Sequence, residues 1–399
     1  MSEHFWPDTQ RVEHAGFTLD IARAAIRNVT YQGAQIIDLL YTAIRPWDWS
    51  TLDPEEHMED VETDGENCIV TITDTFKGLM QGKTILTLRP NGKFTINYQL
   101  SGLGKFEVNR WGVCFCLHSG DWMGSTVSAS GNEYRLLPEI SPQRVIDGVT
   151  QGLFPASHEM YFVAPDKRSL KVVSTGKTLE AEDQRNWTDN TYKVYSGSLA
   201  EPRPFVIESG VIWEQNVEFE VSAPSGAAKD STKIVAKDIP SLPRIGLQFN
   251  GEALLPSDDF EKALFILDID HIRVNEESLT AQKIATVSKS GLTLEAALLS
   301  SHQGAELSRE VEHLSARVPA GSRLLIHREG REIVQDEDLP KNDSLNSYIP
   351  GTDAYLVDLH RNKYNFGDAV SYSMAPTIHS TDPETIFKTL YTQRESIEF

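Results

Sequence analysis

Apolar and polar positions alternate with a period of two through the first part of the chain. The alternation is clear in NCIVTITDTF and in KTILTLRPNGKFTINYQL, and similar short runs recur between turn residues. This period is typical of strands that bury one face, and Asn91-Gly92 between two such runs indicates a hairpin. Many short strands joined by turns predict an antiparallel β-sandwich over residues 1–240.

A different pattern begins after the segment 222–243, which is small, polar and proline-containing and indicates an edge strand followed by a linker. Apolar runs then alternate with amphipathic stretches. We expect strands near residues 245, 272, 296, 325, 356 and 372, and helices in DDFEKALFIL, EESLTAQKIATVSKSG, GAELSREVEHLSARV and DPETIFKTLYTQRESI. Gly291 is expected to end the second of these helices.

This order of strands and helices implies parallel strands joined by right-handed crossovers. Short strands at this spacing favour a TIM-type β/α barrel over a doubly wound sheet, and a closed barrel of that type has eight strands. We therefore expect residues 241–399 to form a partial TIM-type barrel of about six βα units. The predicted fold is multidomain, a β-sandwich followed by an α/β barrel whose end is missing or supplied elsewhere.

Composition excludes several partners. The chain has 399 residues and a formal net charge of −21, which argues against nucleic acid, because phosphate binding needs clustered Lys and Arg, and against anionic membranes. No apolar run approaches the roughly 20 residues of a membrane span, and MSEHFWPDTQRVEHAG at the start has no signal-peptide pattern. Three cysteines without a disulfide framework fit a reducing compartment, so we expect a cytoplasmic protein.

Cys114 and Cys116 are two residues apart, so on a strand they face the same side. A metal site with His118 is an alternative, but partly buried strand cysteines are the commoner arrangement. The run KGLMQGKT has three residues between Gly78 and Gly82, where a phosphate loop needs four. Nucleophile elbow, HExxH, EF-hand and dinucleotide fingerprints do not occur in the sequence. We therefore expect no cofactor and see no metal motif, although a His and Asp set at the mouth of the predicted barrel could bind a metal.

Polar residues gather where the predicted barrel strands end, and function in TIM barrels lies at the carboxyl ends of strands. These residues are Arg273, Glu295, His327, Arg328, Asp358, His360, Arg361, Asn362, His379 and Asp382. Carboxylates from separate strands that meet at one mouth suit general acid–base catalysis, and a nearby imidazole can move a proton. Structural alternatives are an ion pair between Arg273 and Glu295 and a core position for His327.

The stretch EDQRNWTDNTYKVYSG, residues 182–197, mixes charged, amide and aromatic side chains. Polar groups beside aromatic walls are typical of a sugar pocket. The same mixture suits an ordered loop held against its own domain. Composition alone favours the ordered loop.

Several segments together resemble one known family. They are DQRNWTDNTYKVY, LPEISPQRVIDGV, LHSGDWMGSTVSASG, PRIGLQF, DHIRVN, GTDAYLVDLHRN and APTIHSTD. The chain resembles bacterial D-apionate lactonases, which open D-apionolactone to D-apionate in apiose catabolism. The resemblance spans nearly the whole chain, and DQRNWTD is its most specific part. It implies a β-sandwich, a TIM-like barrel and a C-terminal β-domain, and we expect this chain to lack the last barrel strands and the C-terminal domain.

The chain departs from the family pattern at a few positions. Asp358 stands where the family has Glu, and His360 where it has Asn. Ala375 and Thr377 replace an Asn and a Gln. These changes shorten or remove polar side chains at the expected mouth and leave the identity of the substrate open.

The resemblance implies hydrolysis of a small sugar lactone, and position along the chain suggests which residues act. Asp358 or Glu295 is expected to be the general base. His379 is expected to protonate the ring oxygen as it leaves. Arg273 or Arg361 is expected to lie beside the oxyanion that forms on the carbonyl oxygen.

Four further residues are expected to bind the substrate. Asn362 would bind hydroxyl groups at the barrel mouth. The resemblance favours residues 182–197 as a domain-interface loop that shapes the sugar site, with Asp189 among its residues. In that loop Trp187 would stack on a sugar face, and Arg185 would hold a carboxylate with two hydrogen bonds.

Two other functions remain open. A β-sandwich followed by a TIM barrel also suits a glycoside hydrolase-like enzyme, which needs two carboxylates at the mouth. A shortened homologue would serve as a non-catalytic carbohydrate-binding protein. The sequence leaves the oligomeric state open as well.

Overall fold

The computed structural model describes residues 9–22, 24–223, 244–249, 269–340, 345–362 and 368–374, and positions 385, 386, 388, 389 and 392. The chain divides into two compact units, one of residues 1–233 with 376–399 and one of residues 234–375. The expected boundary near residue 240 falls in a segment outside the described residues. The final residues group with the first unit, whereas the sequence assigned them to the barrel.

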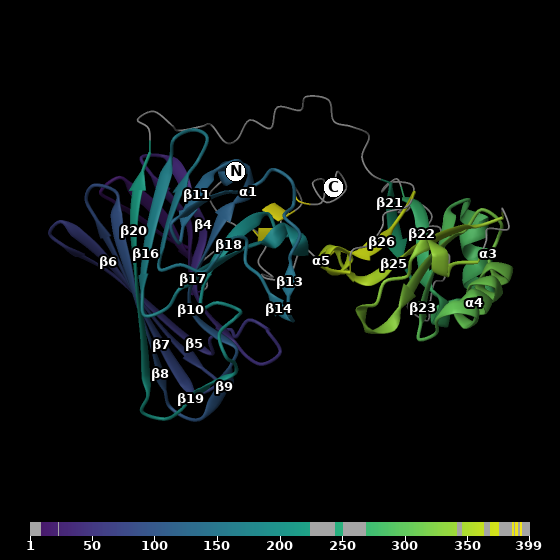
Figure 1. Ribbon diagram of the computed structural model, residues 1–399, viewed down its shortest axis with the longest axis horizontal. Coiled ribbons are helices and arrows are strands. Elements are labelled where there is room, and N and C mark those ends of the chain that lie inside the picture. Colours follow the sequence, from purple (N-terminus) through teal and green to yellow (C-terminus); the bar gives the residue numbers. More distant parts are fainter. Residues whose placement is uncertain are drawn as a thin grey trace. The chain divides into compact units, whose positions relative to one another are not determined.

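The first unit is an antiparallel sandwich of two sheets (Figure 1). The seven-stranded sheet contains, in spatial order, β1 (Gln10–His14), β2 (Phe17–Ala22), β3 (Ala25–Tyr31), β4 (Ala34–Arg45), β10 (Arg110–His118), β18 (Thr191–Ser196) and β17 (Leu179–Asp183). The nine-stranded sheet contains β12 (Asn132–Arg135), β11 (Thr126–Ala129), β15 (Glu159–Val163), β16 (Ser169–Thr175), β20 (Ile212–Ser222), β8 (Lys93–Gly102), β7 (Met80–Arg89), β6 (Asn67–Phe76) and β5 (Glu56–Asp64). The predicted sandwich is confirmed.

Smaller elements connect these strands. They are the two-stranded ribbons β13 (Val145–Ile146) with β14 (Val149–Thr150) and β9 (Phe106–Val108) with β19 (Phe205–Ile207), the short helix α1 (Ser119–Trp122) and the 3-10 turn η1 (Gln184–Trp187).

The sandwich core follows from the period-two pattern. In β6, residues alternate between buried and half-buried positions along the whole strand. Aromatic rings fill the space between the sheets, with Phe94 and Phe219 stacked at 4.4 Å between ring centroids and Phe17 edge-on to Phe94 at 5.6 Å. Burying each such ring contributes ~1.5–3 kcal/mol.

The predicted hairpin at Asn91-Gly92 is confirmed. It joins β7 to β8, with Arg89 paired with Lys93 across the turn. Both turn residues have positive φ, 62° and 73°. A Cβ on Gly92 would lie 2.2 Å from the carbonyl oxygen of Val221, so this turn requires glycine.

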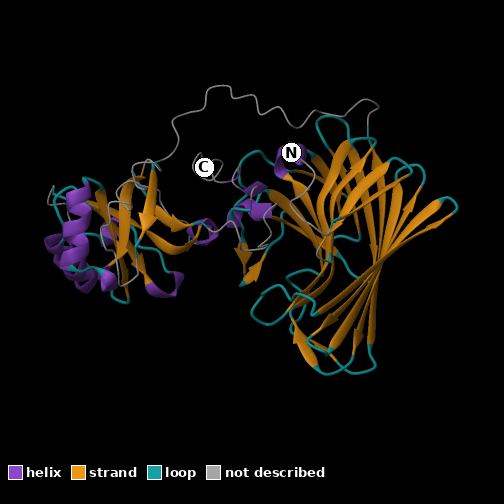
Figure 2. Ribbon diagram, turned by 180° about the vertical axis from the view of Figure 1, so that it is seen from behind, coloured by secondary structure: helices purple, strands orange, loops and turns teal. Residues whose placement is uncertain are grey.

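The second unit is built on a parallel sheet of six strands. They are, in order, β21 (Ile245–Gln248), β22 (Ile269–Asn275), β23 (Thr293–Ser300), β24 (Arg323–Arg328), β25 (Ser347–Tyr355) and β26 (Ser371–Ser373). The helices are α3 (Ala281–Ser290), α4 (Gly304–Arg317) and α5 (Leu356–Arg361), with 3-10 turns η2 (Glu276–Ser278), η3 (Glu329–Arg331) and η4 (Asp336–Asp338). Figure 2 shows this mixture of helices (purple) and strands (orange) in the second unit.

The six predicted parallel strands are therefore present, but a closed TIM barrel is not confirmed. In the described part of the chain, β21 and β26 stand at opposite ends of the sheet and do not pair with one another. The six described strands of the second unit form a parallel half-barrel. Helix α3 ends at Gly291 as expected, because that residue takes the left-handed conformation at φ 74°.

One predicted strand is partly wrong. The apolar run DAYLVDL was expected to be a single strand near residue 356, but β25 ends at Tyr355 and α5 begins at Leu356. The carboxylate of Asp358 accepts the backbone N–H of Tyr355 at 3.2 Å and so closes the first turn of the helix. The expected helix in DDFEKALFIL lies outside the described residues, and the described positions from 385 to 392 are helical.

The sheet of the second unit has two chemically different faces. Ile272, Leu294, Leu324 and Ile326 belong to an apolar core that also contains Leu307, Val311 and Leu314 of α4. Side chains alternate along a strand, so the residues between these apolar positions face away from that core. We call this second side the inner face.

Candidate functional site

The inner face carries charged residues in register. Arg273 of β22 lies opposite Glu295 of β23, and Glu295 lies opposite Arg323 of β24. His327 lies further along β24, near its carboxyl end. The parallel strands therefore place cations, a carboxylate and an imidazole on one side of the sheet.

Glu295 is held in an ion-pair network near the amino end of β23. Its carboxylate accepts a hydrogen bond from Arg323 Nη1 at 2.8 Å, and His271 Nε2 lies 3.4 Å from it. Arg323 also donates to Asp270 at 3.2 Å. The expected structural ion pair of Glu295 is thus made with Arg323. Arg273, its neighbour on β22, adds a favourable charge interaction with Glu295.

A second group of side chains meets near the carboxyl end of β24. Ile326 pairs with Pro350, and Gly351 pairs with Ser371, so His327, Gly351 and Ser371 lie in one row across three neighbouring strands. His327 Nε2 and Ser371 Oγ are 2.8 Å apart.

β25 and β26 lie very close together at Gly351, the position opposite Ser371. A Cβ at Gly351 would lie 1.9 Å from the backbone oxygen of Ser371, which only glycine avoids.

Burial and charge keep His327 neutral. His327 is only 3% exposed. Burial first, and then the positive charge of Arg273, lower the pKa of His327 to about 4. Burial also lowers the pKa of Arg273, and its Nε has no hydrogen-bond partner among the described residues. At neutral pH the site therefore holds an unprotonated imidazole near a guanidinium that has a free donor.

The structure brings Asp358, Arg361 and Asn362 together on and after α5. Asp358 is buried and holds the N–H of Tyr355, as described above. Arg361 Nη1 lies 3.7 Å from the Asp358 carboxylate, and Asn362 Nδ2 donates to the Asp358 backbone oxygen at 2.8 Å. The carboxylate of Asp358 thus has a helix-capping role. His379 and Asp382, the other expected residues near this end, lie outside the described residues.

Arg185 lies in the first unit and is fully buried. Its guanidinium donates to the carboxylate of Asp183 at 2.8 and 2.9 Å, and to the backbone oxygens of Leu137, Pro138 and Glu139 at 2.7 to 3.0 Å. This differs from the expected contact with a product carboxylate, because the guanidinium is engaged by the protein itself. The stretch 182–197 therefore comprises the end of β17, the turn η1 and the strand β18, and Arg185 holds its turn against its own domain.

Two more residues of this stretch were expected to bind sugar. Trp187 is half-buried at the end of η1, and Asp189 is 3% exposed. Asp189 lines a cavity of about 30 Å³ together with Asp38, Cys116 and Gln184. A water molecule needs ~10–15 Å³ of such volume, so the cavity has room for about two or three waters but not for a sugar ring.

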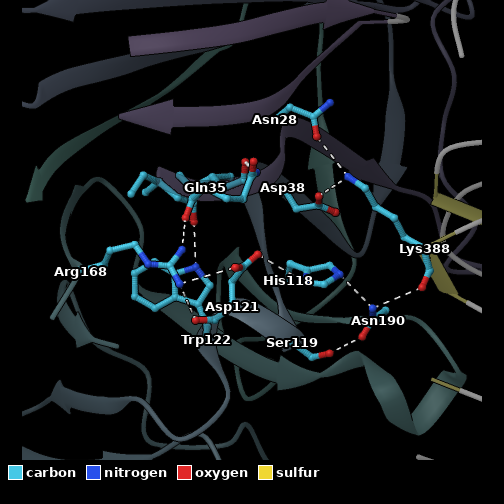
Figure 3. A network of polar contacts seen from close by, with 12 residues as sticks. Asn28, Gln35, Asp38, His118, Ser119, Asp121, Trp122, Arg168, Asn190 and Lys388 are labelled. Carbon is cyan, nitrogen blue, oxygen red and sulfur yellow. Dashed lines mark hydrogen bonds and ion pairs between the residues drawn. The ribbon is translucent and has the colours of Figure 1, made fainter. Parts of the chain in front are cut away.

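A polar network that the sequence did not reveal lies beside this cavity (Figure 3). Lys388 Nζ contacts Asp38 and donates to Asn28 at 3.1 Å. Asn190 donates to His118 Nε2 at 3.0 Å and to the backbone oxygen of Lys388 at 3.3 Å. The single signal in the sequence was Asp38, an acid within the apolar strand AQIIDLLYTAIR.

The network continues across α1. His118 Nδ1 lies 3.4 Å from Asp121, whose other carboxylate oxygen lies 3.5 Å from Arg168 (Figure 3). Arg168 donates to the backbone oxygen of Asp121 at 3.0 Å and packs over the ring of Trp122. These contacts tie α1 to the loop after β15, so the network supports the sandwich.

A family comparison matches the first unit. The model described as "D-apionate lactonase, N-terminal domain" matches residues 2–224, more than half of the chain. The chain belongs to the D-apionate lactonase family. It is 28% identical over 228 residues to a D-apionate lactonase from Brucella anthropi, a match that covers 53% of this chain and 35% of that protein. The chain thus spans about a third of the length of this family relative.

Solved structures resemble this member of the D-apionate lactonase family only distantly. A GalM/aldose epimerase homologue from C. elegans has a TM-score of 0.36 at 10% identity and covers 54% of this chain and 99% of its own. A β-arabinopyranosidase has a TM-score of 0.34 at 10% identity and covers 80% of this chain and 62% of its own.

The cysteines, the metal-ligand groupings and the helix lengths of this family member bear on the expectations from its sequence. Cys114 and Cys116 lie in β10, are buried and free, and face the same side, as expected. Within the described ranges, no group of three His, Cys, Asp or Glu side chains is placed to hold a metal ion. In the same part of the chain, no helix is long and apolar enough to cross a membrane.

Proposed function

We propose that this protein hydrolyses the lactone of a sugar acid, with D-apionolactone as the first substrate to test. The observation that carries the proposal is the neutral imidazole of His327 beside the cation of Arg273, both on the inner face. Membership of the D-apionate lactonase family supports the reaction class.

Lactone hydrolysis needs three things from a protein. A base must take a proton from the attacking oxygen, a donor must stabilise the negative charge on the carbonyl oxygen, and the ring oxygen must receive a proton as it leaves. His327 supplies the base, because its lowered pKa keeps the imidazole unprotonated at neutral pH. Arg273 supplies the donor for the oxyanion, and protonated His327 then returns its proton to the ring oxygen.

The residues expected from the sequence take supporting places in this proposal. Glu295 attracts Arg273 and so helps to hold its charge near the imidazole. Asp358 holds the start of α5 and thereby positions Arg361 and Asn362, which are proposed to bind the hydroxyl groups of the sugar. His379 remains the proposed second proton donor.

The test is acid release from D-apionolactone, followed with a pH indicator, for wild type and His327→Gln. The variant should lower kcat/KM by roughly 100-fold or more, the usual effect of losing a general base, and Arg273→Gln should lower it on a similar scale. His302→Gln is the matched control, because the His302 imidazole is half-exposed and pairs with Glu310 of helix α4. Folded wild-type protein that releases no acid from D-apionolactone or related aldonolactones would overturn the proposal.

Two alternatives are separated by the same preparation. A glycoside hydrolase would cleave chromogenic glycosides and leave the lactone intact. A carbohydrate-binding protein would change its Trp fluorescence with sugar and show no turnover. The engaged carboxylates of Glu295 and Asp358 favour the lactone reaction over glycoside cleavage, which needs two carboxylates facing the substrate.

A further inference from the structure

Ser371 is the partner that the inner face provides for His327. The hydroxyl is half-buried, at the first position of β26, and its Oγ lies 2.8 Å from Nε2. A serine hydroxyl within hydrogen-bond reach of a neutral imidazole is the arrangement that activates a nucleophile. The pair occurs here on two strands of a parallel sheet, without the sharp turn that carries the serine in α/β-hydrolases.

Three observations set this pair apart from an ordinary buried hydrogen bond. His327 lies near the carboxyl end of β24, the end at which parallel sheets place their reactive groups. The guanidinium of Arg273 is close enough to shift the titration of the imidazole, and its Nε is without a partner among the described residues. Gly351, on the strand between them, lets the backbone of Ser371 approach closely, where a Cβ would collide with it.

We propose that Ser371 is the nucleophile of the reaction and that the lactone is opened through an acyl-serine intermediate. This inference rests on the proposed function for its substrate. Nucleophile, base and oxyanion donor would then be Ser371, His327 and Arg273, drawn from β26, β24 and β22.

The steps balance without a cofactor. The Ser371 hydroxyl proton passes to His327 Nε2 while Oγ forms a bond with the lactone carbonyl carbon, and the carbonyl π electrons move to oxygen, beside Arg273. When the carbonyl re-forms, the bond from carbon to ring oxygen breaks, and the ring oxygen takes the proton from His327.

Water completes the cycle in the same way. It gives a proton to His327 and adds to the acyl carbon. The ester bond to Oγ then breaks, and Ser371 recovers its proton from His327. The sum is lactone plus water giving the open hydroxy acid, with no change in oxidation state.

The first experiment uses a fluorophosphonate, because this reagent reports a nucleophilic serine without any sugar substrate. Oγ displaces fluoride at phosphorus, and the proton leaves through His327. Peptide mapping of the full-length protein should place the label on Ser371, and His327→Gln should slow labelling by roughly 100-fold.

Ser373→Ala is the matched control. Ser373 lies two residues along the same strand, with its hydroxyl donating to the backbone oxygen of Asp353 at 2.6 Å. This variant should label like wild type, whereas Ser371→Ala should not label. Labelling in wild type alone already tests the idea, so a folding defect in the variant does not decide it.

The second experiment traps the intermediate during turnover. Acid quench and intact-mass measurement should show an adduct equal to the whole mass of the lactone, because ring opening releases no leaving group, and mapping should place it on Ser371. Lactone opening without a label or adduct on Ser371 would overturn this inference and leave the proposed function standing. A label on Ser371 without lactone opening would support the nucleophile and overturn the proposed substrate.

Discussion

The two units each carry a polar cluster on a sheet, but the clusters differ in how their groups are used. In the first unit, Arg185 donates to Asp183 and to three backbone oxygens, while Asn190 donates through Nδ2 and accepts from the Ser119 hydroxyl through Oδ1. On the inner face of the second unit, Arg273 Nε has no partner among the described residues, and His327 is kept neutral. Fully engaged groups stabilise a fold, whereas a free donor near a neutral base is what the proposed lactone reaction would use.

The largest expected effect on stability comes from replacing Arg185. Arg185→Met keeps the volume of the side chain but leaves Asp183 buried without its cation and three backbone oxygens without their donor. We expect the free energy of unfolding to fall by about 3–5 kcal/mol, measured by urea denaturation. Arg11→Met is the control, because Arg11 pairs with Glu13 on the exposed surface and should change stability little. Equal effects of the two variants would contradict the structural assignment of Arg185.

A smaller effect is expected from the network in Figure 3. Lys388→Met removes the contacts to Asp38 and Asn28 and should lower stability by about 1–2 kcal/mol. A double-mutant cycle with Asp38→Asn should show a coupling of at least ~0.5 kcal/mol. The exposed pair of Lys93 and Glu220, 4.0 Å apart, provides a cycle in which the coupling should be near zero.

The smallest expected effect concerns the second unit and is the pH dependence of lactone opening. With the pKa of His327 lowered to about 4, the imidazole is still unprotonated at pH 5. kcat/KM should therefore change by less than about twofold between pH 7 and pH 5, whereas an imidazole with the ordinary pKa would cost roughly 20-fold. Initial rates of lactone opening at constant ionic strength measure this, with circular dichroism at each pH as the check on folding. A 20-fold loss would show that burial and Arg273 do not hold the base neutral.

Much of the fold follows from local patterns that the sequence states directly. The alternation in β6, β7 and β8 predicted the sandwich, and Gly291 predicted the end of α3. The border between β25 and α5 was missed because LVDL is apolar and suits a strand or a helix equally well. What decides it is the carboxylate of Asp358 folding back on the N–H of Tyr355, a contact that no periodicity reveals.

The candidate site was harder to predict, for a physical reason. Arg273 and Glu295 were recognised as neighbours, but the register of β24 gives Glu295 a different partner, Arg323. His327 and Ser371 are 44 residues apart and meet only across an intervening strand. Arg185 binds backbone oxygens, which are the same for every residue type and leave no mark in a sequence.

The contact between His327 and Ser371 is a product of assembly. His327 and Ser371 meet over a strand that belongs to neither of them, so their hydrogen bond exists only after three successive strands have docked in order. In a chain in which β26 has not yet docked on β25, His327 has no Ser371 hydroxyl opposite it, and the proposed reaction could not start. Under the proposed mechanism, activity would therefore report whether the last described strand has joined its sheet, a step that the close approach at Gly351 permits.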